Sequence, residues 1–125
     1  MRTVKFRAWD KKLKGFHYWD SKSQPENNIF WAMVKAENMP LTQYTGLKNK
    51  TKKEVYENDI IDCSYDNGKA IVKYSEHFAK MSLFFFGNCR KDLKTKLGVG
   101  IFDWIYPEME SVVIGNIYEN PELLK

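Results

Sequence analysis

Two β-prone segments joined by a polar, lysine-rich turn constrain the fold of this chain more than any other feature. The first segment runs from Leu41 to Leu47, and the second leads from Glu54 to Ile61. Gly46 interrupts the first segment, which is typical of a β-bulge or of a close backbone approach. The turn carries four lysines, Lys48, Lys50, Lys52 and Lys53. This pattern predicts strand pairing and turn geometry, and it indicates no chemistry by itself.

Further strand and turn patterns cover most of the remaining chain. Thr3 to Trp9 alternates apolar and charged residues, which predicts a half-buried strand, and Phe16 to Trp19 predicts its return strand. Asn67-Gly68 suits the positive φ values of a type I′ turn, so Ile60–Tyr65 and Ala70–Tyr74 are expected to form a hairpin. Three more strands are expected, at 81–86, 99–106 and 111–118. Many short strands with regular turn signals favour an all-β barrel or sandwich.

Helix signals are few. Ile29 to Ala36 is compatible with a short strand or with one or two helical turns, because periodicity cannot decide so short an apolar run. Near the end of the chain, Asn120 is suited to cap a helix that begins at Pro121. At 125 residues the chain is long enough for one core, so residues 1–125 are expected to form a single domain.

Composition and charge narrow the setting. Neither a signal-peptide core nor an apolar run long enough for a bilayer is visible, so a cytoplasmic protein without membrane contact is expected. Cys63 and Cys89 follow no ligand or disulfide pattern. Residues 1–53 hold 12 Lys and Arg against 4 Asp and Glu, a balance of +8, and residues 54–125 carry −4 within the overall +4. Such asymmetry is compatible with a basic binding face, with self-association, or with charges mixed over one surface.

No pattern in the sequence predicts catalysis, a cofactor or a metal. The densest acidic cluster comprises Glu54, Glu57, Asp59, Asp62 and Asp66. On a strand Asp59 points away from Asp62, and turn or surface roles account for all five carboxylates. Cys63 reads as a core thiol, whereas His17 is expected to be exposed, with no base or nucleophile beside either of them. The chain is therefore expected not to be an enzyme.

Three blocks of sequence carry a family resemblance. They are Lys5-Phe-Arg-Ala-Trp-Asp10, then Gln43-Tyr-Thr-Gly-Leu-Lys48 with Glu54-Val-Tyr-Glu-Asn-Asp-Ile60, and finally Val113-Ile-Gly-Asn-Ile-Tyr-Glu-Asn-Pro-Glu-Leu-Leu124. Together they resemble the YopX family of small phage and prophage proteins over the whole chain. The resemblance implies a mainly β, antiparallel pseudo-barrel with an SH3-like element in the middle and one or two short helices. It implies no assigned biochemical role.

The chain departs from the family pattern at two turns. Asn58 replaces the usual Gly before Asp59-Ile60, which implies a positive φ that Asn tolerates best among non-Gly residues. In the lysine turn Thr51-Lys52 replaces the usual Asn-Gly, so a looser loop is expected there. The residues expected to specify turns and fold are Gly46, Asn58, Asp59, Asn67 and Gly68.

Two functional hypotheses remain open. The first is a non-enzymatic module that binds a protein partner or a second copy of itself, because four tryptophans (Trp9, Trp19, Trp31 and Trp104) are many for so small a core to bury. The alternative is a protein that binds nucleic acid without sequence preference, through Lys48, Lys50, Lys52 and Lys53 and nearby aromatic rings such as Tyr44 or Tyr56. Lysine-rich turns are also common for solubility and edge protection alone.

Overall fold

Two antiparallel sheets make up most of the protein, a computed structural model of which describes residues 3–22, 28–49, 51–63, 68–76, 80–86, 99–100 and 111–124. The first sheet has the order β2-β1-β3-β4, and the second has the order β8-β7-β6-β5-β9. The strands are β1 Lys5–Asp10, β2 Gly15–Asp20, β3 Leu41–Lys48, β4 Glu54–Tyr56, β5 Asp59–Cys63, β6 Gly68–Ser75, β7 Lys80–Phe86, β8 Val99–Gly100 and β9 Ser111–Asn116. The helices are α1, Asn28–Glu37, and a 3-10 helix, Pro121–Leu124.

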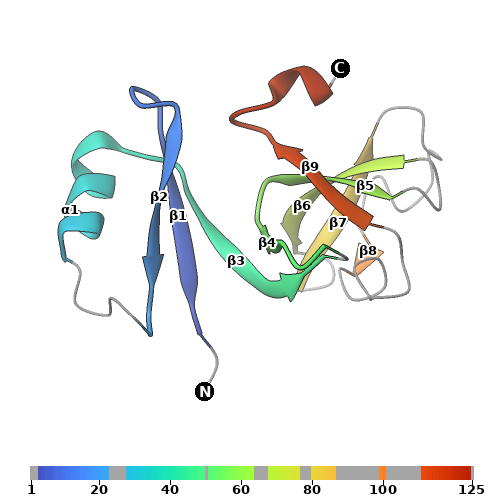
Figure 1. The fold of residues 1–125 in the computed structure, drawn as a ribbon, viewed down its shortest axis with the longest axis horizontal. Coiled ribbons are helices and arrows are strands. Elements are labelled where there is room, and N and C mark those ends of the chain that lie inside the picture. The colour runs from blue at the N-terminus through green and yellow to red at the C-terminus, as the bar shows by residue number, and fades with distance from the viewer. Residues whose placement is uncertain are drawn as a thin grey trace.

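The two sheets are linked through β3. In Figure 1, β3 leaves the neighbourhood of β1 and β2 and runs towards the second sheet, so that β4 lies beside the strands of that sheet. Among the described residues the strands do not hydrogen-bond into one closed barrel. The prediction of a mainly β, antiparallel pseudo-barrel with one or two short helices is confirmed.

The alternation predicted in β1 sorts its side chains between two layers. Phe6 lies opposite Trp19 of β2, and both rings contact Trp31 of α1, with centroids 5.5 and 5.2 Å away. The segment Ile29 to Ala36, for which the sequence left strand and helix open, is part of helix α1. Its Phe30 and Trp31 cover this face of the sheet. The odd-numbered residues of β1 point to the opposite face, where Arg7 contacts Asp59 of the second sheet.

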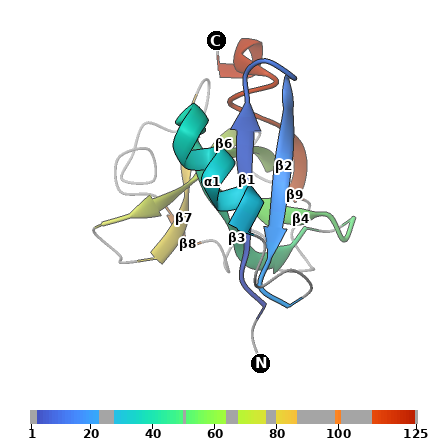
Figure 2. The same cartoon turned by 90° about the vertical axis from the view of Figure 1, so that its left-hand side faces the viewer.

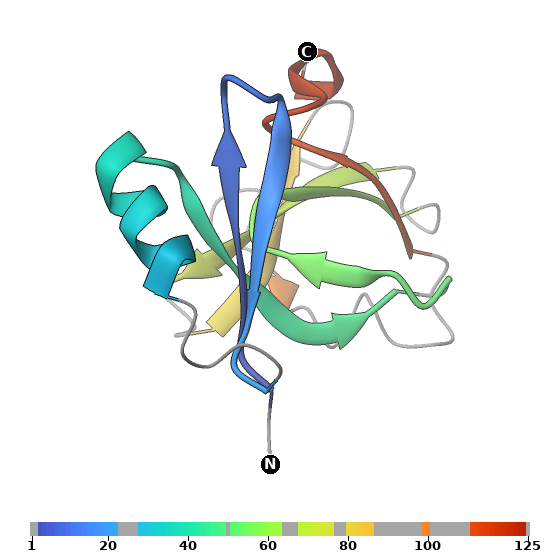
Figure 3. The same cartoon turned by 60° about the vertical axis from the view of Figure 1, so that its left-hand side comes forward.

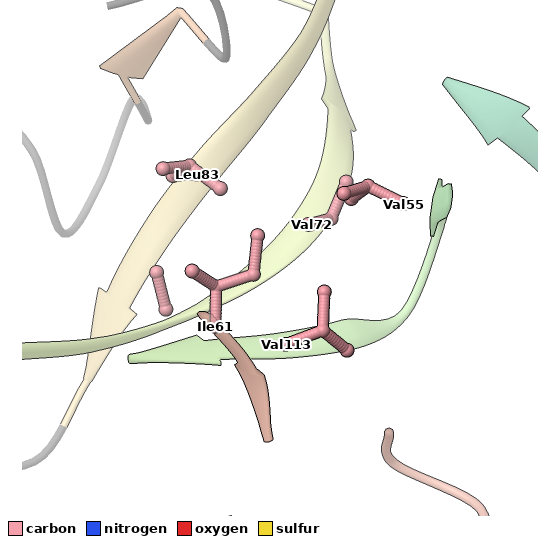
Figure 4. Packing of buried hydrophobic residues seen from close by; sticks show 6 residues of the cluster. Val55, Ile61, Val72, Leu83 and Val113 are labelled. Atoms are coloured by element: carbon pink, nitrogen blue, oxygen red, sulfur yellow. The ribbon is translucent and has the colours of Figure 1, made fainter. Parts of the chain in front are cut away.

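The hydrophobic core lies between β4 and the second sheet. Figure 4 shows its side chains converging from β4, β5, β6, β7 and β9. The buried residues are Val55, Ile61, Ala70, Val72, Leu83 and Val113. Ser82 and Leu83, which point to opposite faces of β7, are both fully buried, as expected for a strand covered on both sides.

The β5–β6 hairpin is present, but its register differs from the expected one. A two-residue turn centred on Asn67-Gly68 would place Asp66 opposite Lys69. Instead Gly68 is a strand residue opposite Cys63, and Lys69 lies opposite Asp62. The prediction that Gly68 is a turn residue is therefore wrong. Its partner Asn67 lies outside the described residues, as do the side chains of Cys63 and Cys89 and most of the strand expected at 99–106.

The lysine turn is hydrogen-bonded, contrary to the looser loop that was expected. The buried Asn49 organises it, because its side-chain oxygen accepts hydrogen bonds from the backbone N–H of Thr51 and of Lys53, both at 3.0 Å. Lys52, at the position where the family resemblance implied Gly, has a φ of 66°. Gly46 has a φ of 89°, and the β3–β4 register shifts between Tyr44 and Lys48, so the irregularity expected at Gly46 is present.

Replacing Lys52 by glycine is expected to stabilise the protein. A left-handed conformation strains a residue with a side chain by about 1 to 2 kcal/mol, and glycine removes that strain at an entropic cost of about 0.5 to 1 kcal/mol. We therefore expect Lys52→Gly to raise the free energy of unfolding by about 1 kcal/mol in urea denaturation. The neighbouring Lys53, also exposed but without a positive φ, is the matched control. Lys53→Gly should destabilise, and equal effects of the two changes would contradict the strain at residue 52.

Candidate functional site

A buried arginine lies at the centre of the seam between the two sheets. Arg7 is only 5% exposed, and its Nη2 donates to the carboxylate of Asp59 at 2.7 Å and to the backbone carbonyl of Glu57 at 3.1 Å. The guanidinium carbon lies 4.2 Å from the ring centroid of Phe16 and 4.6 Å from that of Tyr56. A planar guanidinium suits such a position, because its edge donates hydrogen bonds while its faces contact rings.

Asp59 and Asn58 form the turn that presents the carboxylate to Arg7. Asn58 has a φ of 67°, the left-handed conformation expected where the family carries Gly. Its backbone N–H donates to the Val72 carbonyl at 2.7 Å, and its side-chain amide donates to the Tyr118 hydroxyl at 2.9 Å. The second oxygen of Asp59 accepts the Tyr56 backbone N–H at 2.8 Å. These two predicted turn residues therefore connect β4, β5, β6 and the segment after β9.

The two rings that contact the Arg7 guanidinium, Phe16 and Tyr56, each pack against further aromatic rings. Trp9 stacks on Tyr118 with 5.6 Å between centroids and 19° between planes, and Phe16 contacts both rings. Tyr56 forms a second group with Tyr18 and Tyr44. Tyr56 is buried, which raises the pKa of its hydroxyl and removes it as a platform for bases. Tyr18, which was not singled out in the sequence, is the ring of this group that is most open to solvent, at 58% exposure.

A carboxylate–imidazole pair holds the β1–β2 turn. The Oδ1 atom of Asp10 accepts the backbone N–H groups of Lys12 at 2.9 Å and Leu13 at 3.1 Å. Its Oδ2 atom lies 2.9 Å from Nε2 of His17. The expectation of an exposed His17 is wrong, because strand pairing places it half-buried beside Asp10. The hydrogen bond from His17 and those from the turn lower the pKa of Asp10.

A hollow opens where this turn approaches the C-terminal 3-10 helix, at the end of the molecule where both lie in Figure 3. Its volume is about 520 Å³. Lys11 and Lys14 line it from the β1–β2 turn, and the stacked pair Trp9 and Tyr118 lies between the two elements. The other lining residues are Glu119, Pro121 and Glu122. Leu13, at the tip of the same turn, is 71% exposed.

The predicted lysine site lies elsewhere. Lys48, Lys52 and Lys53 are exposed and take part in no ion pair within the described part of the chain, whereas Lys50 lies outside it. Tyr44, expected to stack on bases, is half-buried with the Lys5 ammonium 5.5 Å from its centroid. Lys5 itself is paired with Glu54. Three lysines of this turn are therefore at the surface, but neither of the two rings expected to stack on bases, Tyr44 and Tyr56, is freely exposed.

The tryptophans are more fully packed than the sequence suggested. Trp9 is buried, and Trp19 and Trp31 are half-buried against each other and Phe6. Trp104 lies outside the described residues. The exposed apolar surface comes instead from Leu13, Tyr18 and Ile29 among others.

Within the described residues, no three His, Cys, Asp or Glu side chains gather as a group that could hold a metal ion. Two carboxylates of the acidic cluster form ion pairs, since Asp59 binds Arg7 and Glu54 binds Lys5. In the same described segments no helix is both long and apolar enough to cross a bilayer.

The fold is that of a small, mainly β protein with two antiparallel sheets and one short α-helix. The model of the YopX protein family matches residues 5–125, so the chain belongs to the YopX family. A crystal structure of protein EF1440 from Enterococcus faecalis has a similar fold, with a TM-score of 0.54, 22% sequence identity and coverage of 98% of both chains. No curated protein matches the chain.

Breaking the Arg7–Asp59 pair is expected to destabilise the protein strongly. Asp59→Ala leaves a buried guanidinium without its charge partner, which typically costs about 3 to 5 kcal/mol. The exposed Lys12–Glu37 pair, at 3.4 Å, is the matched control, since Lys12→Ala should cost less than about 1 kcal/mol. Chemical denaturation measures both.

A double-mutant cycle tests the same pair independently. Arg7→Met combined with Asp59→Leu removes both charges, so its loss should be smaller than the sum of the two single losses. A cost for Asp59→Ala no larger than the Lys12→Ala cost would mean that the buried pair does not hold the sheets together.

The two buried carboxyls are expected to titrate in opposite directions. The His17 hydrogen bond and the turn N–H groups lower the pKa of Asp10 below its ordinary 3.8, whereas burial raises the pKa of Asp59 above 3.8, with Arg7 opposing. The stability contributed by Asp10 is therefore lost as pH falls through its lowered pKa. Asp59 makes stability decrease as pH rises from 3.8 through its raised pKa, because the folded state binds more protons in that window. Carboxyl-detected NMR titration measures both midpoints, and an Asp59 midpoint at or below 3.8 would contradict this account.

Proposed function

We propose that this YopX-family chain is a phage- or prophage-derived, non-enzymatic module that binds a protein partner in the host cytoplasm. The observation that supports this most directly is the hollow between the β1–β2 turn and the C-terminal 3-10 helix. At about 520 Å³ it falls within the range of roughly 300 to 1,000 Å³ that ligand sites occupy. The family membership is compatible with this role and assigns none of its own.

The lining of the hollow suits a peptide segment. The edges of Trp9 and Tyr118 offer apolar and aromatic contact, which is common at protein interfaces. Lys11 and Lys14 lie on one side, and the acidic Glu119 and Glu122 lie on the other. A segment that carries one apolar side chain between charges of opposite sign would match both sides, and Leu13 would extend the apolar contact.

A second candidate function is binding of nucleic acid without sequence preference through the lysine turn. Lys48, Lys52 and Lys53 are exposed and unpaired within the described residues, and the Asn49 hydrogen bonds hold the turn in one conformation. Lysines neutralise phosphates and release counterions, so such binding would weaken steeply with salt. The half-buried position of Tyr44 makes base stacking there a small contribution.

The two basic turns provide matched variants that separate these functions. Lys11→Glu/Lys14→Glu reverses two charges at the hollow, and Lys52→Glu/Lys53→Glu reverses two at the lysine turn. We expect a random-peptide phage library to yield binders to the native chain, and we expect the first variant to lose at least about tenfold in their affinity while the second retains it. Equal losses for both variants, or an absence of binders, would contradict the proposal.

The same variants decide the alternative. If the lysine turn binds phosphates, the native chain should shift single- and double-stranded DNA at low salt in an electrophoretic assay, and Lys52→Glu/Lys53→Glu should abolish the shift while Lys11→Glu/Lys14→Glu retains it. No shift even at low salt removes the nucleic-acid function. Shift lost equally in both variants would indicate attraction by net charge alone.

A further inference from the structure

Of the strands that the structure describes, β2 is a sheet edge that lacks the features protecting the other edges. Edge strands present unpaired N–H and C=O groups, and proteins usually shorten, bulge or charge them. Among the described strands, β4 has three residues and β8 has two, and β9 carries an extra residue where its register against β5 shifts. By contrast, β2 is six residues long, pairs with β1 without a shift, and contains neither Lys nor Pro.

The free side of β2 has a defined set of hydrogen-bonding groups. Ser21 donates its backbone N–H to the Val4 carbonyl at 2.9 Å, so Trp19, His17 and Gly15, two residues apart, also point their backbone groups at β1. Phe16, Tyr18 and Asp20 therefore point theirs away from the sheet. Helix α1 does not cover this edge: it packs on the face that carries Trp19, and in Figure 2 it lies in front of the sheet beside β1.

We propose that β2 pairs antiparallel with β2 of a second copy, which joins the two first sheets into one continuous sheet. This extends the proposed interaction role to a surface that shares Lys14 with the hollow, and the Tyr18 and His17 variants below test it at residues that do not line the hollow. Antiparallel pairing of two identical edges is isologous, because each strand offers the other the same groups. The outward-pointing residues allow three registers, which place Tyr18 opposite Phe16, Tyr18 or Asp20 of the other copy.

Side-chain complementarity selects the register with Tyr18 opposite Phe16. In that register the exposed Tyr18 gains an aromatic neighbour on each side of the two-fold axis, and aromatic cross-strand pairs stabilise sheets. By symmetry, Lys14 of each copy lies opposite Asp20 of the other, so opposite charges meet at both ends of the paired strands. The register with Tyr18 opposite itself keeps one aromatic pair but places Lys14 level with Lys22 and Phe16 opposite Asp20. The register with Tyr18 opposite Asp20 has no aromatic pair among the outward-pointing residues.

Light scattering after size exclusion, over a concentration series, tests the association. The native chain should pass from monomer to dimer mass as concentration rises. Tyr18→Lys places a charge on the edge and should weaken the dimer at least about tenfold. Tyr74→Lys is the matched control, because Tyr74 is similarly exposed, at 52%, but lies on the inner strand β6. A strictly monomeric native chain, or equal weakening by both changes, would overturn the proposal.

Disulfide trapping tests the register. In the selected register residue 17 faces its own counterpart at a non-hydrogen-bonded position, where Cα atoms are about 4.5 Å apart, within the range that a disulfide spans. In a background with Cys63→Ser and Cys89→Ser, His17→Cys should form a covalent dimer under oxidation, whereas Tyr18→Cys should not. Preferential trapping by Tyr18→Cys would overturn the register, and thermal unfolding of each variant establishes that both are folded.

Discussion

The buried contact between Arg7 and Asp59 is the interaction on which the placement of the two sheets depends. Arg7 belongs to β1 in the first sheet, and Asp59 begins β5 in the second. Burying a charge is costly unless its hydrogen bonds are satisfied, and here the Thr42 hydroxyl and the Glu57 carbonyl accept two further guanidinium hydrogen bonds. The pair therefore tolerates little sliding of one sheet on the other. The rings of Phe16 and Tyr56 on the guanidinium narrow the allowed geometry further.

This structural use of charge explains where function can reside. The carboxylate that lies deepest, Asp59, is committed to Arg7 and to the Tyr56 N–H, and Asp10 is committed to His17 and its own turn. Groups held in this way support neighbouring loops and are not presented to a ligand. The exposed side chains include the described lysines of the two turns and the apolar residues Leu13 and Tyr18, which are typical of binding surfaces.

Local patterns predicted much of the fold, and tertiary contacts decided what the patterns left open. The alternation of β1, the return strand β2 and the left-handed turn at Asn58 follow from side-chain periodicity and from the family's Gly at that position. The Arg7–Asp59 pair spans 52 positions, so no local pattern contains it. The Asp10–His17 pair was accessible in principle, because a hairpin that ends at Gly15 brings those positions together. The hollow could not be predicted in this way, since the residues that line it come from the two ends of the chain.

The contacts around Arg7 also affect the free edge of β2, because they fix side chains of that strand. Phe16 stacks on Arg7 and contacts Trp9, and Tyr18 contacts the buried Tyr56, so the side chains on the inner face of β2 are fixed before any partner arrives. A strand that is already extended and immobilised loses little conformational entropy when another strand pairs with it, which favours association at a modest contact area. The Arg7–Asp59 pair that positions the sheets therefore also favours pairing of another strand with the free edge of β2. Among the described edge strands, β2 is neither short nor bulged, and its inner face contacts Arg7 and Tyr56.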